Sequence, residues 1–153
     1  MIAVIRVRGS VNIKPDIRLA LESLNLDRPN HLVLVKEEKE PKKMVDKVKD
    51  YVTFGKIGNE TLAALLEKRG RIEGDQRITP EFLKEKKVSD FADLASRIGE
   101  GKVTLKEMGI KRVFRLHPPK KGHARGGIKR PFAIGGALGN RGEKIDELIK
   151  KMM

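Results

Sequence analysis

The first 57 residues alternate between short apolar runs with the period of a strand and longer stretches with the period of a helix. Residues 1–8, 32–35 and 51–57 are predicted to be strands. A segment beginning at Pro15 and a second beginning at Pro41 each carry an apolar stripe along one helical face, and the second stripe is Met44, Val45, Val48 and Val52. The order β-α-β-α-β predicts an α+β fold, with a small sheet and two helices available to cover one of its faces.

Helices are predicted through most of residues 59–109, which would begin an extension of this 1–57 core. Asn59 is a candidate N-cap, and Thr79 before Pro80 starts a second helix. Residues 91–99 carry an apolar stripe, and Thr104 with Glu107 has the spacing of a capping box. A strand at 113–116, a loop at 117–142 and an amphipathic helix at 143–152 are predicted to follow. We expect all of 58–153 to pack on the core as one unit.

The segment from Lys111 to Gly142 contains nine Lys and Arg, seven Gly and three Pro, but no Asp or Glu. The chain has a net charge of +13, whereas the residues outside this segment hold 25 basic and 21 acidic side chains, a net of +4. Such a segment cannot bury enough apolar surface to fold alone, and its charge favours a polyanionic partner. Because an amphipathic helix follows it, we interpret it as an internal loop rather than a disordered basic tail.

A basic balance of this size fits nucleic acid or an acidic membrane surface, and the Gly- and Pro-rich loop favours RNA. Arg6 and Arg8 on one face of the first strand, with Lys36 at the end of the next, could add a basic sheet face. Ordinary solvent-facing side chains explain these three equally well. The other candidate RNA-binding residues are Lys111, Arg112, Arg115, His117, Lys120, Lys121, His123, Arg125, Lys129, Arg130, Asn140 and Arg141.

Several functional classes lack the residues that they require. The chain has no Cys, which excludes a disulfide, a thiolate metal site and a cysteine nucleophile. The three His are too scattered to be metal ligands, and neither a dinucleotide fingerprint nor a nucleotide-binding phosphate loop occurs. No signal peptide or apolar segment of membrane-spanning length is found. We therefore expect a cytoplasmic, non-enzymatic protein without a metal, cofactor, small-molecule substrate or membrane partner.

The sequence Gly139-Asn140-Arg141-Gly142 precedes the last predicted helix and is similar to the GXXG loop of KH domains. A KH fold needs a helix immediately before this loop, and the Gly-, Lys- and Pro-rich residues 125–137 cannot supply one. The KH assignment therefore fails. Binding of a phosphate at a glycine-lined helix start stays possible.

The order of motifs along the whole chain resembles one family of ribosomal proteins. Residues 5–9, 32–36 and 52–55 are similar to the large-subunit family called L30 in bacteria and archaea and L7 in eukaryotes. Residues 115–119, Gly135-Gly136, residues 139–141 and residues 145–149 are similar to its archaeal form. The bacterial form would correspond to little more than residues 1–57.

This resemblance implies a three-stranded antiparallel sheet in the order third-first-second, related to the ferredoxin-like fold. It also implies a structural protein of the large ribosomal subunit that binds 23S-type ribosomal RNA, close to 5S rRNA, beside neighbouring ribosomal proteins. The alternative function is a free-standing RNA chaperone or regulator that uses the same basic loop.

Overall fold

The structure is a computed structural model that describes residues 1–86 and 88–153. The described residues form one five-stranded sheet in the order β4-β2-β1-β3-β5. Its strands are β1 (Ile2–Arg6), β2 (His31–Val35), β3 (Val52–Lys56), β4 (Val113–Arg115) and β5 (Gly139–Asn140). β1 is antiparallel to both β2 and β3, β4 is antiparallel to β2, and β5 is parallel to β3. The mixed α+β class and the central order third-first-second are confirmed, and one further strand lies at each edge.

Side chains alternate between the two faces of the central strand, as its sequence predicts. Ala3 and Ile5 lie in one apolar cluster, and Val4 lies in a second with Ile2 packed against it. The antiparallel register places Ile5 opposite both Leu32 on β2 and Thr53 on β3. Both faces of this strand therefore lie against packed layers, because every other residue contributes to a different cluster.

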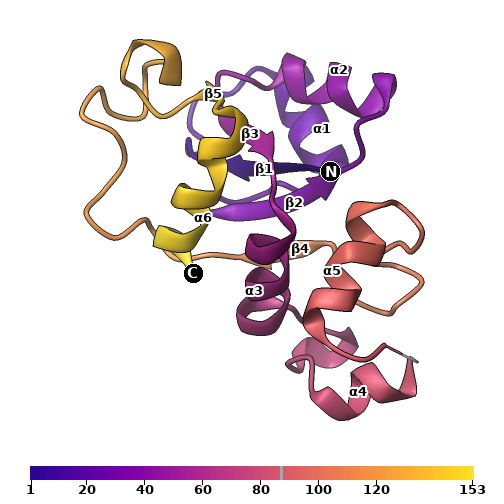
Figure 1. Cartoon of the computed structure of the whole chain (residues 1–153). Coiled ribbons are helices and arrows are strands. Elements are labelled where there is room, and N and C mark those ends of the chain that lie inside the picture. Colours follow the sequence, from indigo (N-terminus) through magenta and orange to yellow (C-terminus); the bar gives the residue numbers. More distant parts are fainter. Residues whose placement is uncertain (87) are drawn as a thin grey trace.

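Two helices, α1 (Pro15–Ser23) and α2 (Lys39–Lys47), cover one face of the sheet (Figure 1). Leu21 and Val45 are almost completely buried against Val4 and its neighbours. The prediction for α2 was wrong in two details. The helix begins at Lys39 rather than at Pro41, and Val52 belongs to β3 and not to the helical stripe.

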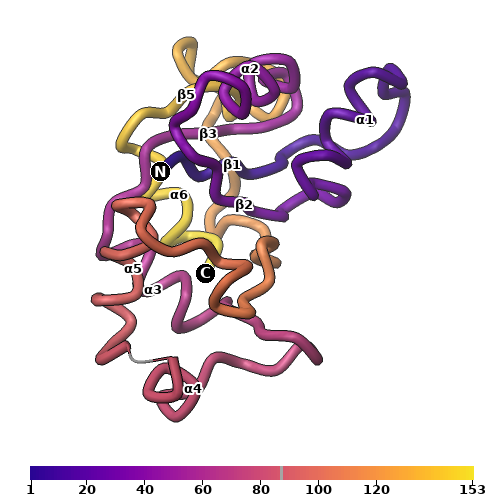
Figure 2. The backbone as a smooth tube through the Cα atoms, turned by 90° about the vertical axis from the view of Figure 1, so that its right-hand side faces the viewer, coloured from indigo at the N-terminus to yellow at the C-terminus, as the bar shows by residue number. Residues whose placement is uncertain are grey.

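The opposite face carries α3 (Asn59–Arg69), α5 (Phe91–Gly99) and α6 (Ile145–Met152), while α4 (Pro80–Glu85) lies at the far end from α1 and α2 (Figure 2). The fully buried Ile5, Leu65, Ile98 and Ile149 share one cluster, so α6 packs against the same apolar layer as α3 and α5. The sheet is thus covered on both faces, the second by residues that follow the 1–57 core.

One predicted cap is wrong, and the predicted capping box is confirmed without the helix that was expected after it. The N-cap of α3 is Gly58, whose N–H donates to both carboxylate oxygens of Asp146 at 3.2 and 3.1 Å, and Asn59 is the first helical residue. Thr104 and Glu107 exchange the two hydrogen bonds of a capping box, yet only turns follow. Gly109, with φ of +72°, ends this segment before a second turn can form.

The stretch from β4 to β5 forms a wide arc beside α6, drawn in orange and yellow in Figure 1. Its first part is fastened to the C-terminal helix, since the N–H groups of His117 and Lys120 donate to the carbonyl oxygens of Met152 and Lys151, both at 3.0 Å. Short 3-10 turns occupy Phe132–Ile134 and Gly142–Lys144, and another lies at Glu73–Asp75. None of the helices in the described ranges is long and apolar enough to cross a bilayer.

Candidate nucleic-acid interface

Most of the candidate side chains of the acid-free segment are exposed to solvent. They are Arg112, Arg115, His117, Lys120, Lys121, Arg125, Lys129, Arg130 and Asn140. Lys111, His123 and Arg141 are half-buried. The predicted concentration of charge in one segment thus corresponds to a line of accessible cations along the arc between β4 and α6.

Arg6 lies in the interior, with only 3% of its surface exposed. Its Nη1 donates to the carbonyl oxygens of Leu26 and Asp27 at 2.6 and 2.7 Å, and its Nε donates to that of Arg8 at 3.0 Å. Its Nη2 donates to Ser10 Oγ at 2.8 Å. Burial lowers the pKa of this guanidinium. Arg6 thus joins β1 to the loop before β2, which corrects its expected place on a basic sheet face.

Arg8 and Lys36 are not part of one surface. The Arg8 guanidinium lies 4.9 Å from the centre of the Tyr51 ring and donates to the Asp50 carbonyl oxygen at 3.2 Å. Lys36 follows Val35, which pairs with Ile2 at the start of β1, whereas Arg8 lies two residues beyond Arg6 at the other end of β1. The predicted basic sheet face is therefore not formed by these three side chains.

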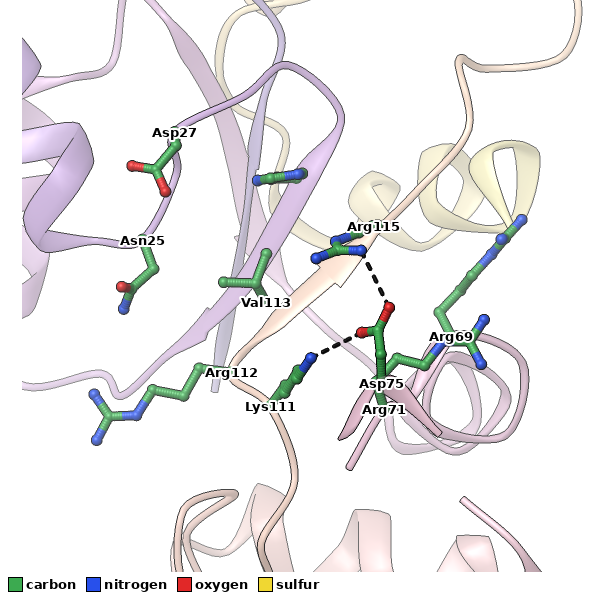
Figure 3. Close-up of a pocket in the computed structure, with 10 residues that line it drawn as sticks. Asn25, Asp27, Arg69, Arg71, Asp75, Lys111, Arg112, Val113 and Arg115 are labelled. Atoms are coloured by element: carbon green, nitrogen blue, oxygen red, sulfur yellow. Dashed lines mark hydrogen bonds and ion pairs between the residues drawn. The ribbon is translucent and has the colours of Figure 1, made fainter. Parts of the chain in front are cut away.

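A basic hollow lies beside the edge strand β4 (Figure 3). The cations Arg69, Arg71, Lys111, Arg112 and Arg115 line it together with Asn25, Asp27, His31, Asp75 and Val113. Lys111 and Arg115 both point at Asp75, with Nζ and Nη1 at 2.8 and 3.3 Å from its two carboxylate oxygens. Burial lowers the pKa of His31, and neighbouring Arg115 lowers it further, so the imidazole is neutral near pH 7.

The hollow shows which residues the sequence analysis missed. Arg69 and Arg71 flank Gly70 at the end of α3, about forty residues before β4 in the chain. Their only sequence signal is a basic pair around a glycine. The isolated bridge between Ile72 and Ile110 brings this segment beside β4.

A second hollow lies where the basic segment meets α6. Lys121, His123, Arg141, Lys144 and Lys151 contribute the basic groups of its lining, and Glu147 contributes a carboxylate. Lys144 and Lys151 lie outside the acid-free segment and were not predicted, although Lys151 lies on the polar side of α6 and Lys144 directly precedes this helix.

Arg141, in the GXXG-like sequence, is held by its own protein. Its Nε donates to Thr53 Oγ1 at 3.0 Å, its Nη2 donates to the Ala137 carbonyl oxygen at 3.2 Å, and its guanidinium lies 4.5 Å from the centre of the Phe132 ring. Burial lowers its pKa. Gly139 and Asn140 form β5 beside β3, so this motif joins the end of the loop to the sheet.

Metal chemistry has no candidate site here, since the described residues contain no group of three or more His, Cys, Asp or Glu side chains that could hold an ion. The hollow beside β4 and the hollow beside α6 are each lined instead by several Lys and Arg. Such a surface can bind anions through charge-assisted hydrogen bonds, and several anions at once where the cations lie in a row.

Comparison with known proteins identifies the family of the chain. The family model described as ribosomal protein L30p/L7e matches residues 2–52. The protein named large ribosomal subunit protein uL30 from Methanococcus vannielii is 50% identical over 151 residues, which cover 99% of this chain and 98% of the relative. Proteins of the same name from Nanoarchaeum equitans and Methanocella arvoryzae are 50% identical over 147 residues and 47% identical over 154 residues, covering 96% and 99% of this chain and 95% and 99% of the relatives. The chain therefore belongs to the ribosomal protein L30p/L7e family, and its similarity to these archaeal members extends over almost its entire length.

Proposed function

We propose that this protein is a structural constituent of the large ribosomal subunit, and that it binds and stabilises folded ribosomal RNA. Its relatives carry the name of a large ribosomal subunit protein, and its family is structural rather than enzymatic. One observation carries the RNA-binding part of the proposal. Exposed cations line a segment without acidic residues, and the backbone of that segment is fastened at both ends, to α6 and to β3.

The hydrogen bonds at both ends of the segment affect how much conformational entropy it would lose on binding RNA. A free basic tail loses much conformational entropy when RNA orders it, and this loss weakens binding. Here His117 and Lys120 are bonded to α6, and the N–H of Arg141 donates to the Phe54 carbonyl oxygen at 2.8 Å. Within the arc the N–H of Gly126 donates to the Gly135 carbonyl oxygen at 2.9 Å. The cations are thus displayed on a partly ordered loop that would lose less entropy on binding.

The proposed partners are 23S-type large-subunit RNA, close to 5S rRNA, together with neighbouring ribosomal proteins, within cytoplasmic ribosomes. The globular part would dock on folded RNA while residues 117–142 pass between RNA helices and neutralise their phosphates. Gly and Pro allow this backbone to follow an irregular RNA surface closely, and Arg can pair with phosphate or stack on bases.

Salt dependence tests the assignment of binding to the loop. Replacing Lys120, Lys121, Arg125, Lys129 and Arg130 with Gln should weaken binding to transcribed archaeal large-subunit RNA, measured by filter binding from 50 to 400 mM KCl. The slope of log K against log salt should flatten by up to about four units, because each neutralised phosphate contributes ~0.7–0.9.

A matched control changes the net charge equally at another place. It replaces the exposed Lys39, Lys42, Lys43, Lys47 and Lys49 in and after α2 with Gln. If this control flattens the slope as much as the loop variant, net charge and not the loop determines binding. Sedimentation of the endogenous protein then separates a subunit constituent from a free-standing RNA chaperone, which would stay at the top of the gradient at moderate salt.

A further inference from the structure

The hollow beside β4 contains a carboxylate at the point where its cations converge. Asp75 lies between Lys111 and Arg115 and is ion-paired with both (Figure 3). These pairs lower the pKa of Asp75, first through the hydrogen bond from Lys111 and then through the charges of Lys111 and Arg115. We propose that this is a binding site for a phosphate group of the RNA backbone, and that Asp75 occupies the phosphate's position in the free protein.

The backbone at Lys111 and Arg115 is hydrogen-bonded to neighbouring segments. The N–H of Lys111 donates to the Arg71 carbonyl oxygen at 2.8 Å, and Arg115 lies opposite His31 in the β2–β4 ladder. Because their backbone is held in this way, the convergence of Lys111 and Arg115 on one point needs little further ordering. Two cations directed at one anion from fixed positions are a common basis of phosphate recognition.

The charge of the hollow exceeds what Asp75 can balance. The described residues that line it include five Lys and Arg but only two carboxylates, Asp75 and Asp27, and of these cations Arg69 donates through Nη2 to the Met153 carbonyl oxygen at 2.6 Å. His31 lies opposite Arg115 in the ladder, and its Nδ1 is buried without a hydrogen-bond partner among the described atoms. The remaining positive charge favours an anion with more than one negative oxygen, which a phosphodiester chain supplies repeatedly.

A phosphate group can readily displace Asp75 from its ion pairs with Lys111 and Arg115. It is half-exposed, and Lys111 and Arg115 are 40% and 69% exposed, so each pair is a solvent-screened surface pair. The residue stands in a tight turn with φ of +64°, after Gly74 with φ of +82°. Asp and Asn are the side chains that tolerate this backbone region best after glycine. An Asp75→Asn substitution therefore removes the charge and keeps the turn.

This site rests on the proposed RNA binding and deepens it, because the hollow adjoins the start of the acid-free segment. Displacement of Asp75 frees Lys111 and Arg115 for the phosphate, but the displaced carboxylate stays near and repels it. Asp75 thus weakens every contact that lacks enough other interactions to overcome this repulsion. It would favour the extended surface of folded ribosomal RNA over short RNA.

The test compares four variants in the filter-binding assay on transcribed large-subunit RNA. Asp75→Asn should raise affinity about 3- to 10-fold at 100 mM KCl and steepen the salt slope by about 0.7–0.9, equivalent to one more phosphate neutralised. The matched control is Glu22→Gln, which removes a carboxylate that is ion-paired with Arg18 at 3.0 Å on α1. In a Lys111→Gln and Arg115→Gln background, Asp75→Asn should change affinity less than 1.5-fold. Thermal melts verify that each variant is folded.

The outcomes separate this inference from the proposed function. If Asp75→Asn matches Glu22→Gln, or if it lowers affinity, Asp75 does not stand in for phosphate and the inference is wrong, while RNA binding by the loop is unaffected. If Asp75→Asn raises the affinity of the protein for polyglutamate as much as its affinity for RNA, the site recognises carboxylates and the phosphate assignment is overturned. If the wild-type protein binds no ribosomal RNA, the proposed function and the inference both fail.

Discussion

Replacement of Arg6 by methionine keeps most of the aliphatic stem of the side chain and removes the guanidinium. In the described structure this guanidinium donates hydrogen bonds to four oxygen atoms. A hydrogen bond from a charged donor contributes about 1.5–3 kcal/mol. The bonds to the Leu26 and Asp27 carbonyls alone therefore account for about 3–6 kcal/mol. The substitution also removes a buried positive charge. Its burial is unfavourable, and it lowers the pKa of Arg6.

The free-energy cost of burying the charge offsets part of the contribution of these hydrogen bonds. We therefore expect Arg6→Met to lower the free energy of unfolding by about 3 kcal/mol. For a chain of this size the melting temperature should fall by roughly 6–12 °C. Urea denaturation and thermal melts followed by circular dichroism measure both quantities. Binding to ribosomal RNA, measured at 15 °C where the variant is still folded, should be unchanged, because Arg6 offers no surface to a ligand.

Arg8→Met is the matched control, two residues later on the same chain segment. Its guanidinium contacts the Tyr51 ring and one carbonyl oxygen near solvent, so its loss should cost at most about 1 kcal/mol. If Arg6→Met melts within 2 °C of the wild type and loses RNA affinity, the reasoning from buried hydrogen bonds is refuted. Arg6 would then be a surface contact.

Other substitutions test the packing of α6 and the titration of a half-buried histidine. Gly55→Ala should lower the free energy of unfolding, measured by urea denaturation, by about 1–3 kcal/mol, because the added Cβ meets the Gly142 carbonyl oxygen where β3 and the start of α6 touch, and an unchanged free energy would contradict this contact. Ile149→Asp should destabilise by more than about 3 kcal/mol, whereas Ile134→Asp, at a position 65% exposed, should change thermal stability by less than about 0.5 kcal/mol. Burial lowers the pKa of His123, so as the pH falls this side chain is protonated in the unfolded chain at a higher pH than in the folded protein. Stability should then decrease as the pH falls below about 6.5, and this decrease should be smaller in His123→Gln in urea titrations at pH 7.5 and 5.5.

The central part of the fold could be predicted because it depends on local periodicity. A period of two places Ala3 and Ile5 on one face of β1 and Val4 on the other, whatever follows in the chain. Helix ends were harder to predict, because their partners can lie far away in sequence. Gly58 and not Asn59 is the N-cap of α3, and its N–H donates to the carboxylate of Asp146, 88 residues later.

The edge strand β5 shows the same limit, whereas β4 was predicted from its own sequence. β5 contains only Gly139 and Asn140, and it is a strand because β3 lies beside it. Thr53 Oγ1 donates to the Gly139 carbonyl oxygen and accepts from Arg141. The GXXG-like sequence suggested phosphate binding at these positions, and this stays a prediction. The local pattern gave no sign that Arg141 would bond to Thr53 and Ala137, because these contacts depend on the neighbouring strand and the preceding loop.

Charge composition locates positive residues along the chain, but binding depends on where they lie in space. The acid-free segment was recognisable because its nine cations are close in sequence. The hollow beside β4 was not, because Arg71 and Asp75 come from the turn after α3 while Lys111 and Arg115 come from β4 and the residues before it. In the sequence Asp75 is one of 21 acidic residues, 36 positions from Lys111. The bridge between Ile72 and Ile110 and the hydrogen bond from the Lys111 N–H to the Arg71 carbonyl oxygen give this carboxylate its place, because they bring Asp75 within 3.3 Å of two cations that would otherwise be free to meet an anion.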